Sequence, residues 1–155
     1  MTSEERIQEQ KKLIESLGMS LEEEGMQPVS CRILALLMVM DKEQFTFDEI
    51  IEELKISKSS ASNALKILQL KDIVEYETRP GDRKRYFQIK RHDPFQLFEK
   101  VKNSMIERNK LLNSIIALKK DPDSENAIFF RDLIRLTELF LENYEKMKEN
   151  FIKNR

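Results

Sequence analysis

The sequence predicts a mainly α-helical protein with one small β-hairpin and further helices at both ends. Apolar residues recur at helical spacing over most of the chain, and only the runs 73–77 and 85–89 have the β-branched and aromatic composition of strands. Two long apolar stripes fill the last third. We therefore expect three parts: an N-terminal dimerisation helix over 1–25, a small mixed domain over 26–92 and a helical dimerisation region over 93–155.

The N-terminal segment predicts an amphipathic helix over about residues 3–17. Its apolar side is narrow and includes Ile7 and Ile14, and either Gly18 or Gly25 is expected to end the helix. A helix with so narrow a stripe is not stable in water unless the stripe packs on something. We therefore assign Ile7 and Ile14 to a dimer interface.

The next helix is expected to form the core of the small domain. Pro28 suits the first turn of a helix, and residues 29–39 are apolar nearly all round. Most of the surface of this helix must therefore be covered by the rest of the domain.

A short helix, a tight turn and a second helix follow. The Thr46 hydroxyl and the Glu49 carboxylate have the spacing of a capping box, which starts the short helix. Ser57 is the expected N-cap of the second helix, which lies within the stretch 56–68. This is the helix-turn-helix pattern, in which the second helix reads the major groove of DNA.

The second helix of this pair has one packing face and one polar face. Ala61, Leu65 and Leu68 recur on the packing face, whereas the polar face carries hydroxyls, an amide and two lysines, with no carboxylate from Ile56 to Leu70. A helix face without negative charge suits a groove lined with phosphates, and an ordinary solvated face is the alternative interpretation. The residues expected to contact double-stranded DNA are Ser57, Lys58, Ser59, Ser60, Ser62, Asn63 and Lys66.

A β-hairpin with a basic tip comes next. The two β-prone runs flank residues 78–84, which are rich in turn formers. A helix-turn-helix followed by such a hairpin is a winged helix, and a cation at its tip suits the minor groove of DNA. Solubilising surface charge is the alternative for these cations. The wing residues expected to contact DNA are Arg79, Arg83, Lys84 and Arg85, with Arg83 as the main contact.

Two long helices are predicted after Asp93, with a break at residues 119–123. The apolar stripe of the second is longer than a small winged-helix body can cover from one side. We therefore expect a homodimer that buries the stripe across a two-fold axis, and an operator that is an inverted repeat. The stripe, assigned to the dimer interface, consists of Phe129, Leu133, Leu136, Phe140, Tyr144, Met147 and Phe151.

Composition limits the compartment and the chemistry. The net charge is −1, but residues 1–25 hold seven acidic against three basic side chains and residues 56–91 hold nine basic against four acidic. One cysteine permits no intrachain disulfide, and no apolar run approaches the roughly 20 residues of a membrane span, so we expect a cytoplasmic protein without a membrane partner. The usual nucleophile, metal and dinucleotide motifs are absent from the sequence. We expect no enzyme activity, no metal and no cofactor.

Three segments together resemble the GbsR branch of the MarR-type transcriptional regulators. They are Gly25–Pro28 before the apolar helix, Ile56–Ser62 at the start of the DNA-facing helix and Arg79–Phe87 at the wing. The resemblance spans nearly the whole chain and implies a homodimeric winged-helix repressor or other regulator that dimerises through its terminal helices. Some members respond to a small-molecule effector such as choline or glycine betaine. Residues 59–62 read Ser-Ser-Ala-Ser where many relatives have Gly and Val, which bears on base preference.

Several interpretations stay open. A winged-helix protein-interaction scaffold that does not read DNA is the main competing function. Cys31, beside Arg32, fits a redox role or, more commonly, a small buried apolar side chain. His92 has no Cys or His near it and is expected to be a linker residue. The two trailing stripes fit an effector pocket or plain packing equally well.

Overall fold

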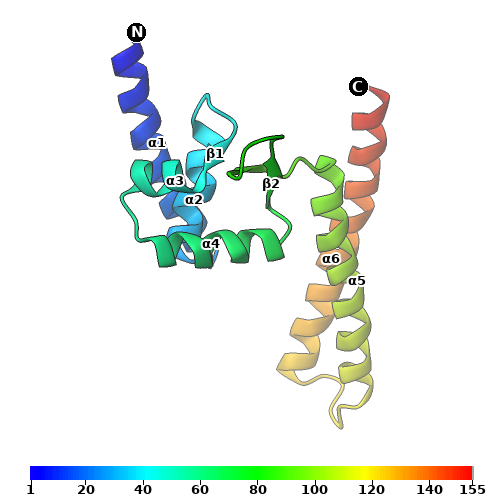
Figure 1. The fold of residues 1–155 in the computed structure, drawn as a ribbon. Helices are drawn as coiled ribbons and strands as arrows, with labels where there is room; N and C mark the ends of the chain where they lie inside the picture. The colour runs from blue at the N-terminus through cyan, green and yellow to red at the C-terminus, as the bar shows by residue number, and fades with distance from the viewer. Residues whose placement is uncertain (155) are drawn as a thin grey trace. The chain divides into compact units, whose positions relative to one another are not determined.

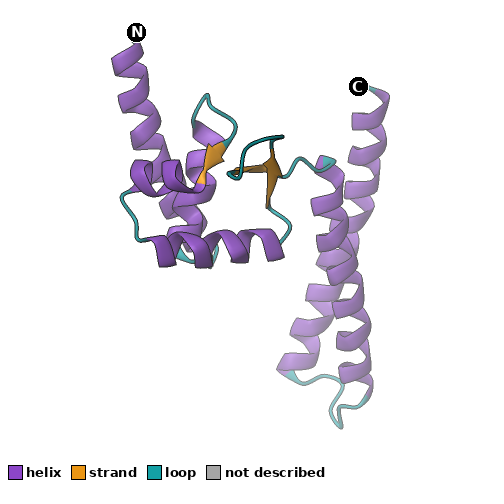
Figure 2. Ribbon diagram, viewed as in Figure 1, coloured by secondary structure: helices purple, strands orange, loops and turns teal. Residues whose placement is uncertain are grey.

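The computed structural model describes residues 1–154, which form six α-helices and three short strands (Figure 1). Helices dominate, and the strands are confined to one small sheet (Figure 2). The chain divides into two compact units, Met1–Arg91 and His92–Arg155. The predicted fold class, a mainly helical winged helix with additional helices, is confirmed. In chain order the elements are α1 (Ser3–Glu23), α2 (Pro28–Val39), β1 (Phe45–Thr46), α3 (Phe47–Leu54), α4 (Lys58–Leu70), β2 (Val74–Thr78), β3 (Arg85–Ile89), α5 (Pro94–Ala117) and α6 (Glu125–Lys153).

Helix α1 is longer than predicted and packs against α2. It continues through Gly18, where a Cβ atom would meet the Arg32 Cγ atom at 3.6 Å, an ordinary contact. The chain turns only at Gly25, whose φ of 90° favours glycine. Ile14 is 5% exposed in the core of this unit, so it does not lie on an outer surface as its assignment to a dimer interface required. Ile7 is 43% exposed.

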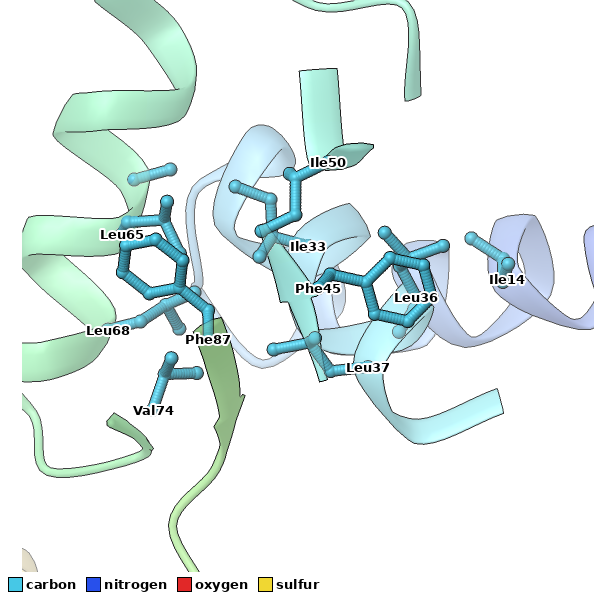
Figure 3. Packing of buried hydrophobic residues seen from close by; sticks show 12 residues of the cluster. Ile14, Ile33, Leu36, Leu37, Phe45, Ile50, Leu65, Leu68, Val74 and Phe87 are labelled. Atoms are coloured by element: carbon cyan, nitrogen blue, oxygen red, sulfur yellow. The ribbon is translucent and has the colours of Figure 1, made fainter. Parts of the chain in front are cut away.

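Helix α2 is the centre of the first unit. Pro28 occupies its first turn, as predicted, and Ile33, Ala35 and Leu36 are at most 1% exposed. Side chains from α1, α3, α4 and all three strands join the same apolar cluster (Figure 3). A helix that is apolar on every side is stable in water only when it is covered in this way.

The helix-turn-helix forms as predicted. Thr46 and Glu49 make the capping box of α3, and Lys55 ends that helix in the left-handed region. Ser57 caps α4, because its Oγ atom accepts a hydrogen bond from the Ser60 backbone N–H at 3.2 Å. Four residues hold α4 against the core by burial of their side chains: Ala61, Ala64, Leu65 and Leu68.

The sheet contains one strand that the sequence analysis missed. The order is β1-β3-β2 and all pairs are antiparallel, with Phe45 opposite Phe87 and Thr46 opposite Tyr86. Strand β1 has only two residues, too few to show a period of two in the sequence. Phe45 and Phe87 are both buried, so the wing is joined to the helix-turn-helix by backbone pairing and by shared apolar packing (Figure 3).

The second unit is an antiparallel pair of helices. The start of α5 meets the end of α6, since the ring centroids of Phe95 and Phe151 lie 5.2 Å apart. Tyr144 is 4% exposed and packs near Phe98, with 6.2 Å between ring centroids. Its assignment to the outer stripe is therefore corrected: it lies three residues after the half-buried Leu141, on the side of α6 that faces α5.

An ion network joins the same ends of these two helices. Glu99 accepts hydrogen bonds from Lys148 Nζ at 2.7 Å and lies 3.0 Å from Lys102 Nζ, which also contacts Glu145 Oε1 at 2.7 Å. The hydrogen bonds from Lys148 and Lys102 lower the pKa of the Glu99 carboxyl from 4.5 to about 2. The carboxylate form is thus favoured by the fold.

This network predicts a specific pH dependence of stability. Because the folded-state pKa of Glu99 is depressed, its contribution is complete above pH 4.5 and is lost as the pH falls towards 2. Replacement Glu99→Gln should therefore lower stability at pH 6 and flatten the loss of stability between pH 4.5 and 2, as measured by urea unfolding at a series of pH values. Glu107→Gln, in an exposed pair with Lys110 on the same helix, is the control. Parallel profiles for wild type and Glu99→Gln would contradict the prediction.

Candidate nucleic-acid interface

Helix α4 presents a polar face to solvent. Lys58, Ser59, Ser62, Asn63 and Lys66 are all exposed, and they alternate with the buried apolar positions of the same helix. No acidic residue lies within α4. The face therefore combines positive charge with short hydrogen-bonding groups, which suits both phosphates and base edges.

The first turn of α4 is held by serine hydroxyls. Ser57 Oγ lies 2.8 Å from Ser60 Oγ and 3.2 Å from Ser59 Oγ, in addition to accepting the Ser60 N–H. Ser60 is half-buried. Ser57 and Ser60 thus help to start the helix, and Ser57, Ser59 and Ser62 are the exposed serines of this region.

The four cations predicted for the wing have different surroundings. Arg83 and Lys84 are exposed, and neither side chain makes an ion pair or a hydrogen bond within residues 1–154. The Arg79 guanidinium lies 3.7 Å above the Tyr86 ring centroid and donates from Nη2 to Gln44 Oε1 at 3.0 Å. The Arg85 guanidinium lies 4.6 Å from the Tyr76 ring centroid.

A groove separates α4 from the wing. It has a volume of about 570 Å³ and is basic along both walls. Gln69 and Asp48 also line it, and the sequence analysis named neither. Helical spacing could have identified Gln69, which lies three residues after Lys66 and seven after Ser62 on the same face. The groove is lined by Thr46, Phe47, Asp48, Ser62, Leu65, Lys66, Gln69, Arg83, Lys84, Arg85 and Phe87.

The one acid in the wing loop is bonded within the wing. Asp82 Oδ2 accepts a hydrogen bond from the Tyr86 hydroxyl at 2.6 Å, and Oδ1 accepts from the Lys84 backbone N–H at 2.9 Å. The Tyr86 bond and then the Lys84 bond lower the pKa of the Asp82 carboxyl. Its negative charge is therefore held between these donors, while Arg83 and Lys84 project from the same loop.

The remaining candidates lack the features of a chemical site. Cys31 is fully buried and burial raises the pKa of its thiol, which opposes the lowered pKa that a redox role beside Arg32 required. Within residues 1–154 no group of three or more His, Cys, Asp or Glu side chains is placed to hold a metal ion. No helix in this part of the chain is long and apolar enough to span a bilayer. His92 is half-buried at the start of the second unit.

Most of the predicted dimer stripe on α6 is exposed. The side chains of Phe129, Leu136 and Phe140 are 60%, 65% and 52% exposed, and Leu133, Met147 and Phe151 are also at the surface of their unit. Exposed apolar side chains that recur along one side of a helix are typical of a protein–protein interface.

Comparison with known proteins finds a family model that matches part of the chain and solved structures of similar fold. A model of the MarR family matches residues 24–85, from just after α1 to the start of β3. The crystal structure of a transcriptional regulator aligns with 94% of this chain and 99% of its own, at 20% identity and a TM-score of 0.67. No curated protein matches the chain. The regulator structure supports the winged-helix fold, and the family model agrees with the prediction that the chain is not an enzyme.

Two further solved structures align with most of the chain at lower similarity. A mutant of S. aureus MepR covers 99% of this chain and 95% of its own, at 17% identity and a TM-score of 0.43. Staphylococcus aureus MarR in complex with salicylate and kanamycin covers 87% and 82%, at 22% identity and a TM-score of 0.39.

Proposed function

We propose that the protein is a MarR-type transcriptional regulator that binds double-stranded DNA as a homodimer, with α4 in the major groove and the wing against the adjacent backbone or minor groove. The observation that carries the proposal is the exposed, carboxylate-free face of α4 beside two exposed wing cations, Arg83 and Lys84, whose side chains have no ion pair within residues 1–154. The MarR family match over residues 24–85 supports it, because those residues include α4 and most of the wing. Assignment to the GbsR branch, action as a repressor and response to a small ligand belong to the same proposal and rest on the sequence resemblance.

The residues of the interface divide by chemistry into two groups. Lys58, Lys66, Arg83 and Lys84 place charge where phosphates can be neutralised, which gives affinity without sequence information. Ser59, Ser62 and Asn63 offer hydrogen bonds to base edges, and an asparagine amide can pair with two atoms of adenine. Base preference is therefore expected to depend on the middle of the exposed face of α4.

The homodimer is proposed from the exposed side of α6. Helix α6 has 29 residues, and its exposed apolar side chains from Phe129 to Met147 cover about 27 Å at 1.5 Å per residue. Pairing with the same surface of a second copy removes these apolar side chains from water and creates a two-fold axis. Two copies of α4 related by such an axis require an operator that is an inverted repeat.

The competing function is a protein-interaction scaffold that does not bind DNA. Both functions use the exposed surface of α6, but only the regulator needs the charge distribution on α4 and the wing. Electrophoretic mobility shift with the DNA upstream of the protein's own gene separates them. A sequence-selective shift supports the regulator, and equal binding or none on all DNA supports the scaffold.

The first prediction concerns specificity. Asn63→Ala should weaken binding to the preferred site by about 1 to 3 kcal/mol per contacted base pair and leave binding to random DNA nearly unchanged, because it removes hydrogen bonds to a base edge. Fluorescence anisotropy with both DNAs measures the two affinities. Equal losses on both would assign Asn63 to phosphate contact.

The second prediction concerns salt. Replacing Arg83 and Lys84 with Ala in both copies removes up to four phosphate contacts, so the slope of log K against log salt should become shallower by about 3 to 4. The measurement is affinity for one DNA at several salt concentrations. Lys11→Ala with Lys100→Ala removes two exposed cations elsewhere and is the control. An unchanged slope for the wing variant would show that the wing does not contact phosphates.

The third prediction concerns assembly. Leu136→Glu with Phe140→Glu places charge on the proposed interface but at positions exposed within the chain, so each unit should fold while the dimer dissociates. Sedimentation at micromolar concentration should find a monomer that binds DNA weakly. Arg135→Glu, an exposed change beside the same surface, should remain dimeric. A dimeric Leu136→Glu/Phe140→Glu variant would rule out this interface.

A further inference from the structure

The wing loop between β2 and β3 is built from two consecutive turns. The Asp82 N–H donates to the Arg79 carbonyl at 3.0 Å, with Pro80 and a left-handed Gly81 (φ 77°) between them, which is the sequence pattern of a type II turn. The Asp82 carboxylate then accepts the Lys84 N–H, so Arg83 is the central residue of the second turn. The backbone of Arg83 is thus held from both sides.

Polar contacts continue from this loop across the sheet. The Tyr86 hydroxyl donates to Asp82, and the Tyr86 ring supports the Arg79 guanidinium. Arg79 in turn donates to Gln44 Oε1, and the Gln44 amide donates to Glu77 Oε2 at 2.9 Å. The same amide donates to Gln88 Oε1 at 2.7 Å. Since side chains alternate along a strand, these groups lie on the face of the sheet opposite the buried Val74 and Phe87.

This chain of contacts ends at the helix-turn-helix. Gln44 directly precedes β1, and Thr46 of β1 both pairs with Tyr86 and caps α3. The wing loop is therefore tied to the same two-residue strand that starts the helix-turn-helix. Movement of the loop relative to that strand would have to break the Arg79 bond to Gln44 or the Tyr86 bond to Asp82.

We propose that Asp82, Tyr86 and Arg79 are positioning residues that hold the wing so that Arg83 meets DNA, and that Arg79 itself does not bind phosphate. The inference rests on the proposed DNA-binding function. A loop fixed before binding loses less conformational entropy when it binds, so the network increases affinity without touching DNA. The sequence alone assigned DNA contact to all four wing cations, with Arg83 as the main contact. Their surroundings now separate Arg79, which is stacked and bonded, from Arg83, whose side chain has no ion pair or hydrogen bond within residues 1–154.

Replacement of Arg79 tests the assignment most directly. Arg79→Lys keeps the charge but loses the planar group that stacks on Tyr86 and reaches Gln44. If Arg79 positions the wing, Arg79→Lys should weaken DNA binding as much as Arg79→Ala does, roughly 2- to 10-fold for each wing. If Arg79 binds phosphate instead, Arg79→Lys should keep the affinity and the salt slope of wild type, and the proposal is overturned.

A double-mutant cycle tests the coupling of Tyr86 to Arg83. Tyr86→Phe removes only the hydroxyl, and Tyr76→Phe makes the same change on the neighbouring strand as a matched control. The loss of affinity caused by Arg83→Ala should be smaller in Tyr86→Phe than in wild type, because Arg83 is no longer held in place. If Tyr86 contributes only to folding stability, the losses of affinity caused by Tyr86→Phe and by Arg83→Ala should add in free energy. That result would contradict the proposal.

A measurement without DNA separates this inference from the proposed function. The Tyr86 hydroxyl is the main cause of the lowered pKa of Asp82, so Tyr86→Phe should raise that pKa in an NMR titration of the free protein. An unchanged pKa would mean that the Asp82 contact does not exist in solution and would overturn the inference. Wild type that shows the lowered pKa but never binds DNA would instead reject the proposed function.

Discussion

The first unit depends on the burial of one helix, α2, that is apolar nearly all round. Ile33, Ala35 and Leu36 of α2 are nearly inaccessible to water, and no single neighbour can cover them all. Helices α1 and α4 and strand β3 therefore all pack on α2. Because α4 contributes buried side chains along one side, it cannot rotate about its axis without exposing them. The identity of the outward face, with Ser62 and Asn63 on it, follows from that packing.

The two residues of β1 couple this helical core to the wing. Phe45 enters the core beside α2, while Thr46 caps α3 and pairs with Tyr86 of β3. The hairpin is thus fixed by apolar packing on one face of the sheet and by the polar contacts of Gln44 on the other. A two-stranded hairpin alone is marginally stable in water. Strand β1, although very short, fixes the hairpin relative to the helix-turn-helix. The groove between α4 and the wing therefore has a fixed geometry.

The sequence predicted those features that depend on local chemistry. Pro28, the Thr46 capping box and the Ser57 cap each act within one helical turn, and each starts a helix where expected. Features set by tertiary contacts were missed: Gly18 lies inside α1 because α1 packs on α2, and β1 exists because β3 lies beside it. The sequence predicted the wing cations as a group, with Arg83 as the main contact. The surroundings of Arg79 could not be predicted, because only the folded sheet brings its side chain to Tyr86 and Gln44, which are seven and 35 positions away in sequence.

In the second unit, α6 leaves several of its large apolar side chains exposed. Its side towards α5 buries Ala127, Ile134 and Tyr144, and an ion network around Glu99 lies at one end. Its outer side carries large apolar groups such as Phe129 and Phe140. The hydrophobic effect scales with the apolar area removed from water, so covering these exposed side chains would add stability to the unit. The proposed homodimer would cover these side chains with the same surface of a second copy, related by a two-fold axis.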